Sequence, residues 1–268
     1  MQNKLEKMYF SQNSLKIFSQ CKMKFRKRYL DGLFWSNWGL DSDETARTEK
    51  GRLFHLLAYR YFLDLDSKAD RVNPEFQELA GWMESLKKFI KLSDGCSYYP
   101  EFELRINLGE LRLQAKFDLI VIENNGRATI FDWKVQDKPL NRKLLQTSYQ
   151  TIVYRYLLAG AGETIKGTKI APENISMVYW QPSYPSDPVK MDYSTALFGE
   201  DEMLLRKEIG RILDCDFNSP HIKTSDRKVC RYCEFCSICN DFQPDMNSIS
   251  TDEPDFDLDW DSTLEIEF

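Results

Sequence analysis

Three successive apolar stretches joined by turn sequences restrict the fold of this chain more than any other feature. They cover residues 102–108, 111–123 and 128–135, and they are joined by Leu-Gly-Glu and Asn-Asn-Gly. Apolar runs of this length between turn residues are typical of β-strands, and Asn-Gly is a strong hairpin signal. The sequence therefore predicts three consecutive paired strands.

Two acids and a lysine interrupt the apolar pattern of these predicted strands. Asp118 lies in the second strand, and Asp132 and Lys134 lie in the third. Because side chains alternate along a strand, Asp132 and Lys134 project from one face, and the hairpin can bring Asp118 beside them. Unpaired carboxylates among apolar side chains are costly, so we expect a cation there. A divalent metal site is the functional interpretation; a buried Asp–Lys ion pair with a second Asp at a strand end is the structural one.

Apolar residues at helical spacing surround the predicted strands. The pattern predicts one more strand over residues 175–181 and helices over residues 10–33, 51–65, 74–92, 141–159 and 199–214. This order of elements favours an α/β fold: a mixed central sheet flanked by helices, whose last strand is reached by a helical crossover.

The net charge of −6 comes from the C-terminal end of the sequence. Residues 241–268 carry ten acidic and no basic residues, so the rest is mildly basic, with 36 basic residues against 32 acidic ones. No apolar run approaches the roughly 20 residues of a membrane span, and charges interrupt the region where a signal peptide would be apolar. We expect a cytoplasmic protein with one domain over residues 1–242. The acidic tail, residues 243–268, is expected to be unstructured or to bind a protein partner.

Four of the seven cysteines fall within ten residues: Cys230, Cys233, Cys236 and Cys239. An odd number of cysteines without an export signal favours reduced thiols over a disulfide framework. Thiolates this close repel one another unless a soft cation neutralises them, so the sequence predicts a metal centre. The alternative is a run of ordinary buried thiols.

These motifs together resemble a known family. Asp118 followed by Asp132-Trp133-Lys134 resembles the acidic strand and the D-x-K strand of the PD-(D/E)XK nuclease superfamily. Gly51-x-x-x-His55 and Gln150-x-x-x-Tyr154 resemble two further elements of its RecB/AddB-like and CRISPR-associated adaptation branch. The resemblance extends over residues 10–240.

The cysteines add to the resemblance. Cys21, with Cys230, Cys233 and Cys239, is similar to the four ligands of the iron–sulfur cluster found in that branch. The resemblance therefore implies a [4Fe–4S] cluster that fastens the N-terminal helix to the C-terminal segment, with zinc as the alternative. Cys236 is an additional thiol within the spacer and could replace a neighbouring ligand.

The resemblance also implies a restriction-endonuclease-like fold and metal-dependent DNA cleavage. His55, Asp118 and Asp132 would bind Mg²⁺ or Mn²⁺, and Lys134 would orient the attacking water. Gln150 and Tyr154 would position the DNA strand. Exonuclease-like action on single strands or ends, in repair, recombination or defence, is the expected function. Glu101 or Glu103 would add an outer contact to the metal shell.

Basic residues indicate how such a protein would hold DNA. A cationic channel is expected from two segments, with Phe25 and Tyr29 stacking on bases. Its members would be Lys22, Lys24, Arg26, Lys27 and Arg28, together with Arg227, Lys228 and Arg231.

Two non-enzymatic interpretations compete with the nuclease. The chain could be a DNA-end-binding or adaptor subunit of a larger assembly, whose acidic tail docks on a partner or lies in the chain's own cationic channel. It could also be a zinc-ribbon interaction protein, but that interpretation leaves the grouping of Asp118, Asp132 and Lys134 unexplained.

Overall fold

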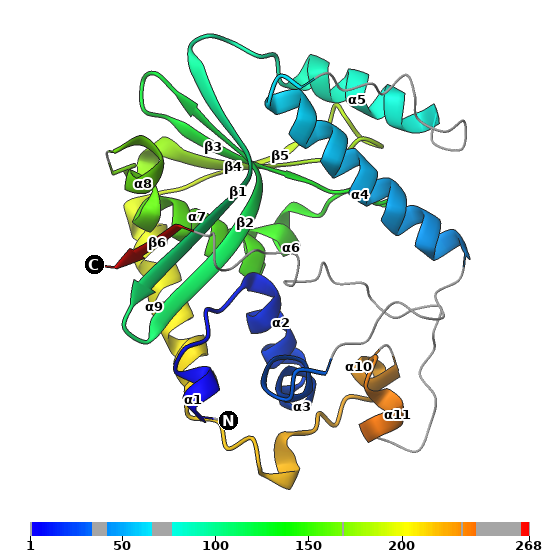
Figure 1. Ribbon diagram of the computed structural model, residues 1–268, viewed down its shortest axis with the longest axis vertical. Coiled ribbons are helices and arrows are strands. Elements are labelled where there is room, and N and C mark those ends of the chain that lie inside the picture. The colour runs from blue at the N-terminus through cyan, green and yellow to red at the C-terminus, as the bar shows by residue number, and fades with distance from the viewer. Residues whose placement is uncertain are drawn as a thin grey trace.

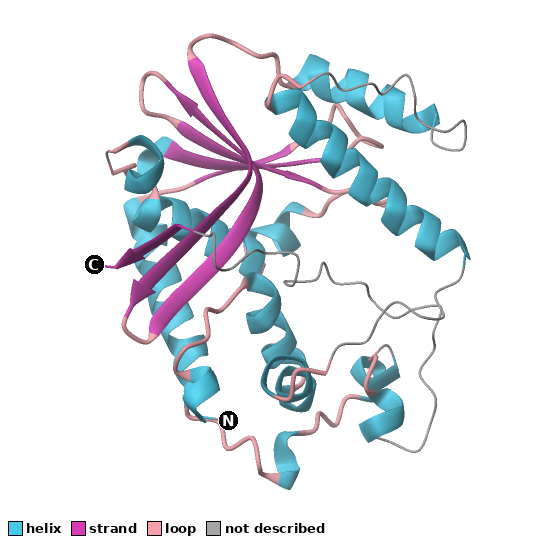
Figure 2. Ribbon diagram, in the orientation of Figure 1, coloured by secondary structure: helices cyan, strands magenta, loops and turns pink. Residues whose placement is uncertain are grey.

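A mixed six-stranded sheet forms the centre of the computed structural model, which describes residues 2–33, 42–65, 77–167, 169–231, 233–239 and 264–267. The strand order is β5-β4-β3-β2-β1-β6. The bounds are β1 (Cys96–Leu108), β2 (Leu111–Glu123), β3 (Ala128–Trp133), β4 (Ile175–Trp180), β5 (Val189–Asp192) and β6 (Leu264–Glu267). The predicted α/β fold with a mixed sheet and flanking helices is confirmed (Figure 2).

The three predicted consecutive strands form an antiparallel meander. Leu108 pairs with Leu111 across the first turn, and Ile122 pairs with Ala128 across the second. β4 then pairs with β3 in parallel after a helical crossover, as expected, and β5 adds an antiparallel edge. β5 was not predicted, because four residues with only one buried side chain give too short a pattern.

Among the described residues, helices lie against both faces of the sheet (Figure 1). Their bounds are α1 (Gln2–Leu5), α2 (Gln12–Gln20), α3 (Lys22–Phe25), α4 (Ser42–Phe62), α5 (Gln77–Phe89), α6 (Arg142–Gln146), α7 (Tyr149–Ala161), α8 (Glu163–Lys166), α9 (Thr195–Leu213), α10 (Arg227–Arg231) and α11 (Cys236–Cys239). Short 3-10 turns occur at Pro172–Asn174 and Pro220–Ile222, and a π-helical turn spans Arg26–Leu30.

Alternate residues of the central strands enter two separate cores. Ile120 and Ile122 of β2 belong to the larger core, which includes α2, α7 and α9. Leu119 and Val121 belong to the smaller core beneath α4 and α5. This alternation follows from the two-residue period of a strand, and it explains why residues 119–122 of β2 form an unbroken apolar run.

Two predicted helices are broken in the structure. The helix expected over residues 10–33 is interrupted at Cys21, whose extended backbone ends α2 and whose sulfur accepts a hydrogen bond from the Lys24 amide at the start of α3. The helix expected over 141–159 is interrupted at Ser148, whose hydroxyl caps α7 through the Thr151 amide. Local caps therefore divide segments whose apolar periodicity is continuous.

Near the C-terminus, residues Leu264–Glu267 form β6, which pairs in parallel with β1 from Leu104 to Asn107. This strand falls within the segment predicted to be an unstructured tail, so the prediction is wrong for these four residues. The rest of the tail lies outside the described residues. Within the described part of the chain, no helix combines the length and apolar character that crossing a membrane requires.

Candidate active site

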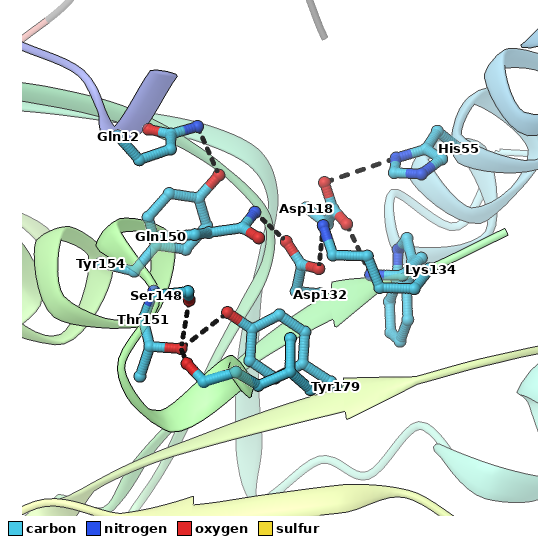
Figure 3. A network of polar contacts seen from close by, with 12 residues as sticks. Gln12, His55, Asp118, Asp132, Lys134, Ser148, Gln150, Thr151, Tyr154 and Tyr179 are labelled. Atoms are coloured by element: carbon cyan, nitrogen blue, oxygen red, sulfur yellow. Dashed lines mark hydrogen bonds and ion pairs between the residues drawn. The ribbon is translucent and has the colours of Figure 1, made fainter. Parts of the chain in front are cut away.

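The two aspartates predicted to share a site lie side by side on neighbouring strands. The β2–β3 ladder runs to the pair Leu119 and Phe131, and Asp118 and Asp132 are the next residues in that register. Beyond this pair, the Asp118 side chain connects the two strands, because its Oδ2 accepts a hydrogen bond of 2.7 Å from the Trp133 amide. The hairpin thus fixes both carboxylates by backbone geometry (Figure 3).

Asp118 gathers two further groups from different elements. His55, on α4, places Nδ1 at 3.4 Å from Asp118 Oδ1. Glu101, on β1, joins them: one ligand atom from each of the three residues lies within 4.8 Å of the other two. All three side chains are partly exposed, so solvent and ions can reach them. The set of two carboxylates and one imidazole fits an oxygen-preferring divalent cation.

Glu101 has an unusual backbone conformation directly opposite Asp118. The β1–β2 ladder pairs Pro100 with Leu119 and Phe102 with Phe117, which leaves Glu101 opposite Asp118 without a ladder pairing between the two. Its φ is +52°, a left-handed value that residues other than glycine seldom adopt and that often marks functional positions. Its carboxylate also pairs with Lys116 Nζ at 2.9 Å.

The charges around this group shift the pKa values of both carboxyls. Burial acts to raise the pKa of Asp118, but His55, Lys134 and the Trp133 amide outweigh it, so its pKa lies below the ordinary value. Burial and the negative charge of Asp118 raise the pKa of Glu101 above its ordinary value. The negative charge of Asp118 thus opposes ionisation of Glu101, and a bound cation would relieve that repulsion.

Asp132 lies beside this group with partners of its own. Lys134 Nζ is 2.7 Å from Asp132 Oδ2, and Gln150 Nε2 donates to Asp132 Oδ1 at 2.7 Å. The Asp–Lys pair of the structural interpretation is thus present, but it does not account for His55, Glu101 and Asp118 gathered next to it. Lys134 also lies over the Tyr179 ring, 5.7 Å from its centroid.

The Gln150–Tyr154 stripe of α7 contacts the protein's own strands. Tyr154 is only 2% exposed, and its hydroxyl donates to the Lys116 carbonyl at 2.7 Å. In the structure Tyr154 holds β2 near Asp118, and its predicted role in positioning the DNA strand stays a prediction. Gln150, half-buried, links α7 to Asp132.

A second set of hydrogen bonds, not predicted from the sequence, fixes the Tyr179 ring over which Lys134 lies. Thr151 Oγ1 lies 2.8 Å from the Tyr179 hydroxyl and donates to the Leu145 carbonyl at 2.7 Å. Burial and the charge of Asp132 raise the pKa of Tyr179, so its hydroxyl stays protonated. The sequence carries no motif that relates Tyr179 to Lys134. Their proximity follows from the parallel pairing of β4 with β3, which places Tyr179 opposite Asp132.

Five of the seven cysteines line one cavity between the two ends of the domain. Its lining includes Cys21 from the start of α3 and four thiols from the C-terminal segment: Cys230, Cys233, Cys236 and Cys239. Cys96 and Cys215 lie elsewhere. Within the described residues, no three cysteine sulfurs lie within 4.8 Å of one another. Burial and the charge of Glu234 raise the pKa of the Cys233 thiol to about 12.

An ion pair crosses the same cavity wall. Lys24 Nζ lies 3.0 Å from Glu234 Oε2, and both side chains are buried. The N-terminal α3 and the cysteine-bearing segment are therefore in direct contact, and Figure 1 shows α10 and α11 near α3.

The predicted cationic channel is corrected at two positions. Lys24 faces Glu234 rather than solvent, and Phe25 is 0% exposed, stacked on Phe217 with ring centroids 5.6 Å apart. Neither residue can contact DNA in this arrangement. Phe25 belongs to the larger core, which a basic amphipathic pattern could not reveal because Phe217 is far away in sequence.

Comparisons with known proteins bear on the family of this chain. A model of the PD-(D/E)XK nuclease superfamily matches residues 9–240. The solved structure of a protein from Eubacterium rectale named "Putative exonuclease" is similar with a TM-score of 0.54 and 13% identity, covering 90% of this chain and 91% of that one. A second solved structure, SSO0001, gives a TM-score of 0.34 at 17% identity, covering 85% and 94%. No curated protein matches the sequence.

Proposed function

Because the chain belongs to the PD-(D/E)XK nuclease superfamily, we propose that it is a metal-dependent deoxyribonuclease that acts on single strands or DNA ends in an exonuclease-like manner. The observation that carries this proposal is the approach of His55, Glu101 and Asp118 to within 4.8 Å of one another. The Asp132–Lys134 pair lies immediately beside them. Such an activity would serve DNA repair, recombination or defence.

Mg²⁺ or Mn²⁺ is the proposed ion, and the donor set supports it. His55 and Asp118 would be ligands, with Glu101 as the third group and Asp132 as the further carboxylate assigned from the sequence. Oxygen donors suit both ions, and the single imidazole favours Mn²⁺. When bound, the ion would supply Lewis acidity toward the scissile phosphate and lower the pKa of an attacking water.

Lys134 is proposed to orient the attacking water and to offset negative charge at the phosphate. Its ammonium lies 2.7 Å from Asp132 and above the Tyr179 ring, so its position is held from two sides. A fixed cation contributes more to a developing negative charge than a mobile one, because no reorganisation is needed during the reaction. Gln150 is proposed to keep Asp132 oriented through its 2.7 Å hydrogen bond.

The RecB/AddB-like and CRISPR-associated branch is the proposed subgroup. The contact of His55 with Asp118 and that of Gln150 with Asp132 support it, since both elements on which the branch resemblance rests meet the two aspartates. Each of these contacts joins a helix to the strand pair. The subgroup implies the iron–sulfur cluster considered next.

We further propose that the cysteine cavity holds a [4Fe–4S] cluster through Cys21, Cys230, Cys233 and Cys239. The lining of one cavity by thiols from both ends of the domain supports this. A zinc–sulfur bond of about 2.3 Å would place tetrahedral ligand sulfurs about 3.8 Å apart. No three sulfurs of the described residues lie that close to one another, so the preference for an iron–sulfur cluster over zinc rests on the resemblance in cysteine spacing. Cys236, which lines the same cavity, is the candidate to replace one ligand.

Cleavage of end-labelled single-stranded, linear duplex and circular DNA, with Mg²⁺, Mn²⁺ or a chelator, tests the nuclease. We expect metal-dependent digestion of linear substrates, lost in Asp132→Asn and Lys134→Met. Asp192→Asn is the matched control, because that carboxylate is exposed on β5. Unchanged digestion by both site variants would overturn the assignment. Binding of DNA ends without any cleavage by the parent protein would favour a non-catalytic subunit.

A further inference from the structure

The segment between the two site residues Lys134 and Gln150 projects into solvent. Residues 136–147, which we call the cationic arm, are exposed at nearly every position and carry three basic residues against one acid. Leu144, on α6 within the arm, is 71% exposed, more than any other large apolar side chain among the described residues. Leu144 is thus an exposed apolar side chain flanked by cations, on a segment that is attached to the site at both ends. This combination needs an explanation.

The base of the arm is fixed by a buried glutamine. Gln181, directly after β4, is only 2% exposed. Its Oε1 accepts from the Leu140 amide at 2.9 Å, and its Nε2 donates to the Lys138 carbonyl at 2.9 Å and to the Gln136 carbonyl at 3.4 Å. Gln181 thus uses its amide group entirely to hold the arm's backbone, which lowers the entropy cost of binding with the arm.

The tip of the arm is held from the other side. Asn141 caps α6 by accepting from the Lys143 and Leu144 amides. Thr151, one residue after Gln150, donates to the Leu145 carbonyl at 2.7 Å. The arm is therefore a shaped projection anchored to the same network as Lys134, and Leu144 is adjacent to an anchored residue.

We infer that the cationic arm binds an unpaired polynucleotide end, with Lys138, Arg142 and Lys143 on its phosphates and Leu144 against a base. This rests on the proposed nuclease function and names the part of the surface that receives its substrate. A polynucleotide combines closely spaced negative charge with flat apolar rings, which matches the arm's combination of cations and one leucine. A single strand fits better than a duplex, because bases within a duplex are stacked and do not offer their faces to Leu144.

Fluorescence anisotropy with a labelled single-stranded oligonucleotide tests the inference without cleavage, in chelator. Lys138 is left in place, and the double variant Arg142→Ala/Lys143→Ala should weaken binding. It should also reduce the slope of log affinity against log salt by about 1.4, since each single-strand phosphate contact contributes about 0.7. Lys207→Ala, exposed on α9 across the sheet from α4, is the control for removing a surface charge and should change the slope by less than half as much.

The base contact has its own test. Leu144→Ala should weaken binding of the normal oligonucleotide about fivefold, the effect of withdrawing part of one leucine from a contact. The same variant should bind an oligonucleotide with abasic sugars as tightly as the parent does. Met203→Ala is the matched control, because Met203 is 68% exposed on α9.

The outcomes separate this inference from the nuclease proposal. Parent protein that cleaves DNA, with arm variants that bind and cleave equally well, would overturn the inference and leave the nuclease in place. Parent protein that never cleaves, with arm variants that lose affinity and salt dependence, would overturn the nuclease and keep the arm as a binding surface. Equal loss of affinity by Leu144→Ala on normal and abasic probes would remove the base contact.

Discussion

The candidate active site and the cysteine cavity both join residues distant in sequence, but they are assembled differently. The active site is built on the paired strands β2 and β3, where the ladder register and the Trp133 amide place Asp118. The cysteine cavity is built on α3, α10 and α11, of four, five and four residues. Helices this short are not stable by themselves, so their arrangement depends on side-chain contacts and on what the thiols bind.

The difference teaches that a site held by a sheet can be preorganised without its ligand, whereas a site held by short helices would be strengthened by the cross-link that we propose for it. In the first region backbone pairing supplies the geometry, and the ion would only relieve charge repulsion. In the second region, among the described residues, Lys24–Glu234 is the one ion pair within 3.0 Å that links α3 to the cysteine-bearing C-terminal segment. The two regions should therefore respond to substitution in opposite ways.

The largest expected effect is on activity, at Asp118. Asp118→Asn keeps an acceptor for the Trp133 amide but removes the charge beside His55, so cleavage should fall about a thousandfold or more. The midpoint of thermal unfolding should change little. Rates on labelled DNA and a thermal melt measure both. If the variant also lost the visible absorbance expected of the proposed iron–sulfur cluster, the two regions would form one cooperative unit and the comparison would fail.

Removing the metal group proposed for the cysteine cavity should have the second largest effect, and on stability rather than chemistry. A cross-link between Cys21 and Cys230 closes a very long loop, which by the loop-entropy estimate stabilises the fold by roughly 4 to 5 kcal/mol. After chelation, hydrogen exchange should accelerate in α2, α3 and α10, while β2 and β3 keep their protection. Uniform acceleration across the sheet would show that the cavity is not a separate region.

How far the sequence predicted these regions follows from how each is built. The strand pattern and the turns placed Asp118 and Asp132 on paired strands because period and register are local properties, whereas Lys134, predicted within the third strand, lies directly after the end of β3. Glu101 was named only as an outer contact, yet counting back from the Leu108–Leu111 pair places it opposite Asp118. Its left-handed backbone, by contrast, has no sequence signal.

The N-terminal helix shows what could not be predicted. Its basic and apolar pattern suggested a DNA-facing surface, but Lys24 and Phe25 are covered by Glu234 and Phe217. Periodicity identifies which residues share a helix face, and it does not identify which distant segment covers that face. The breaks at Cys21 and Ser148 were missed for a related reason: a cap is a hydrogen bond of one side chain, and it leaves the apolar pattern intact.

A smaller effect on stability is expected at the ion pair of the cysteine cavity. Lys24→Met leaves the buried Glu234 carboxylate without its 3.0 Å partner, which should lower the free energy of unfolding by about 3 kcal/mol. Arg28, 4.0 Å from the other Glu234 oxygen, should reduce this loss. Urea unfolding measures it. Lys190→Met is the control, since its pair with Asp192 is exposed and should contribute under about 0.5 kcal/mol. Equal losses in the two variants would contradict a role for the buried pair.

The smallest effect is expected at Tyr154, whose hydroxyl bonds to the β2 backbone close to Asp118. Tyr154→Phe removes the hydroxyl that donates to the Lys116 carbonyl and leaves that carbonyl short of a partner, which should cost about 1 kcal/mol of stability. Cleavage should fall only a few-fold, because the β2–β3 ladder still places Asp118. Tyr61→Phe is the matched control, as its hydroxyl donates to the Ile90 carbonyl at 3.3 Å away from the site. A loss of cleavage as large as that of Asp118→Asn would mean that Tyr154 acts in the chemistry itself, and that backbone pairing alone does not preorganise the site.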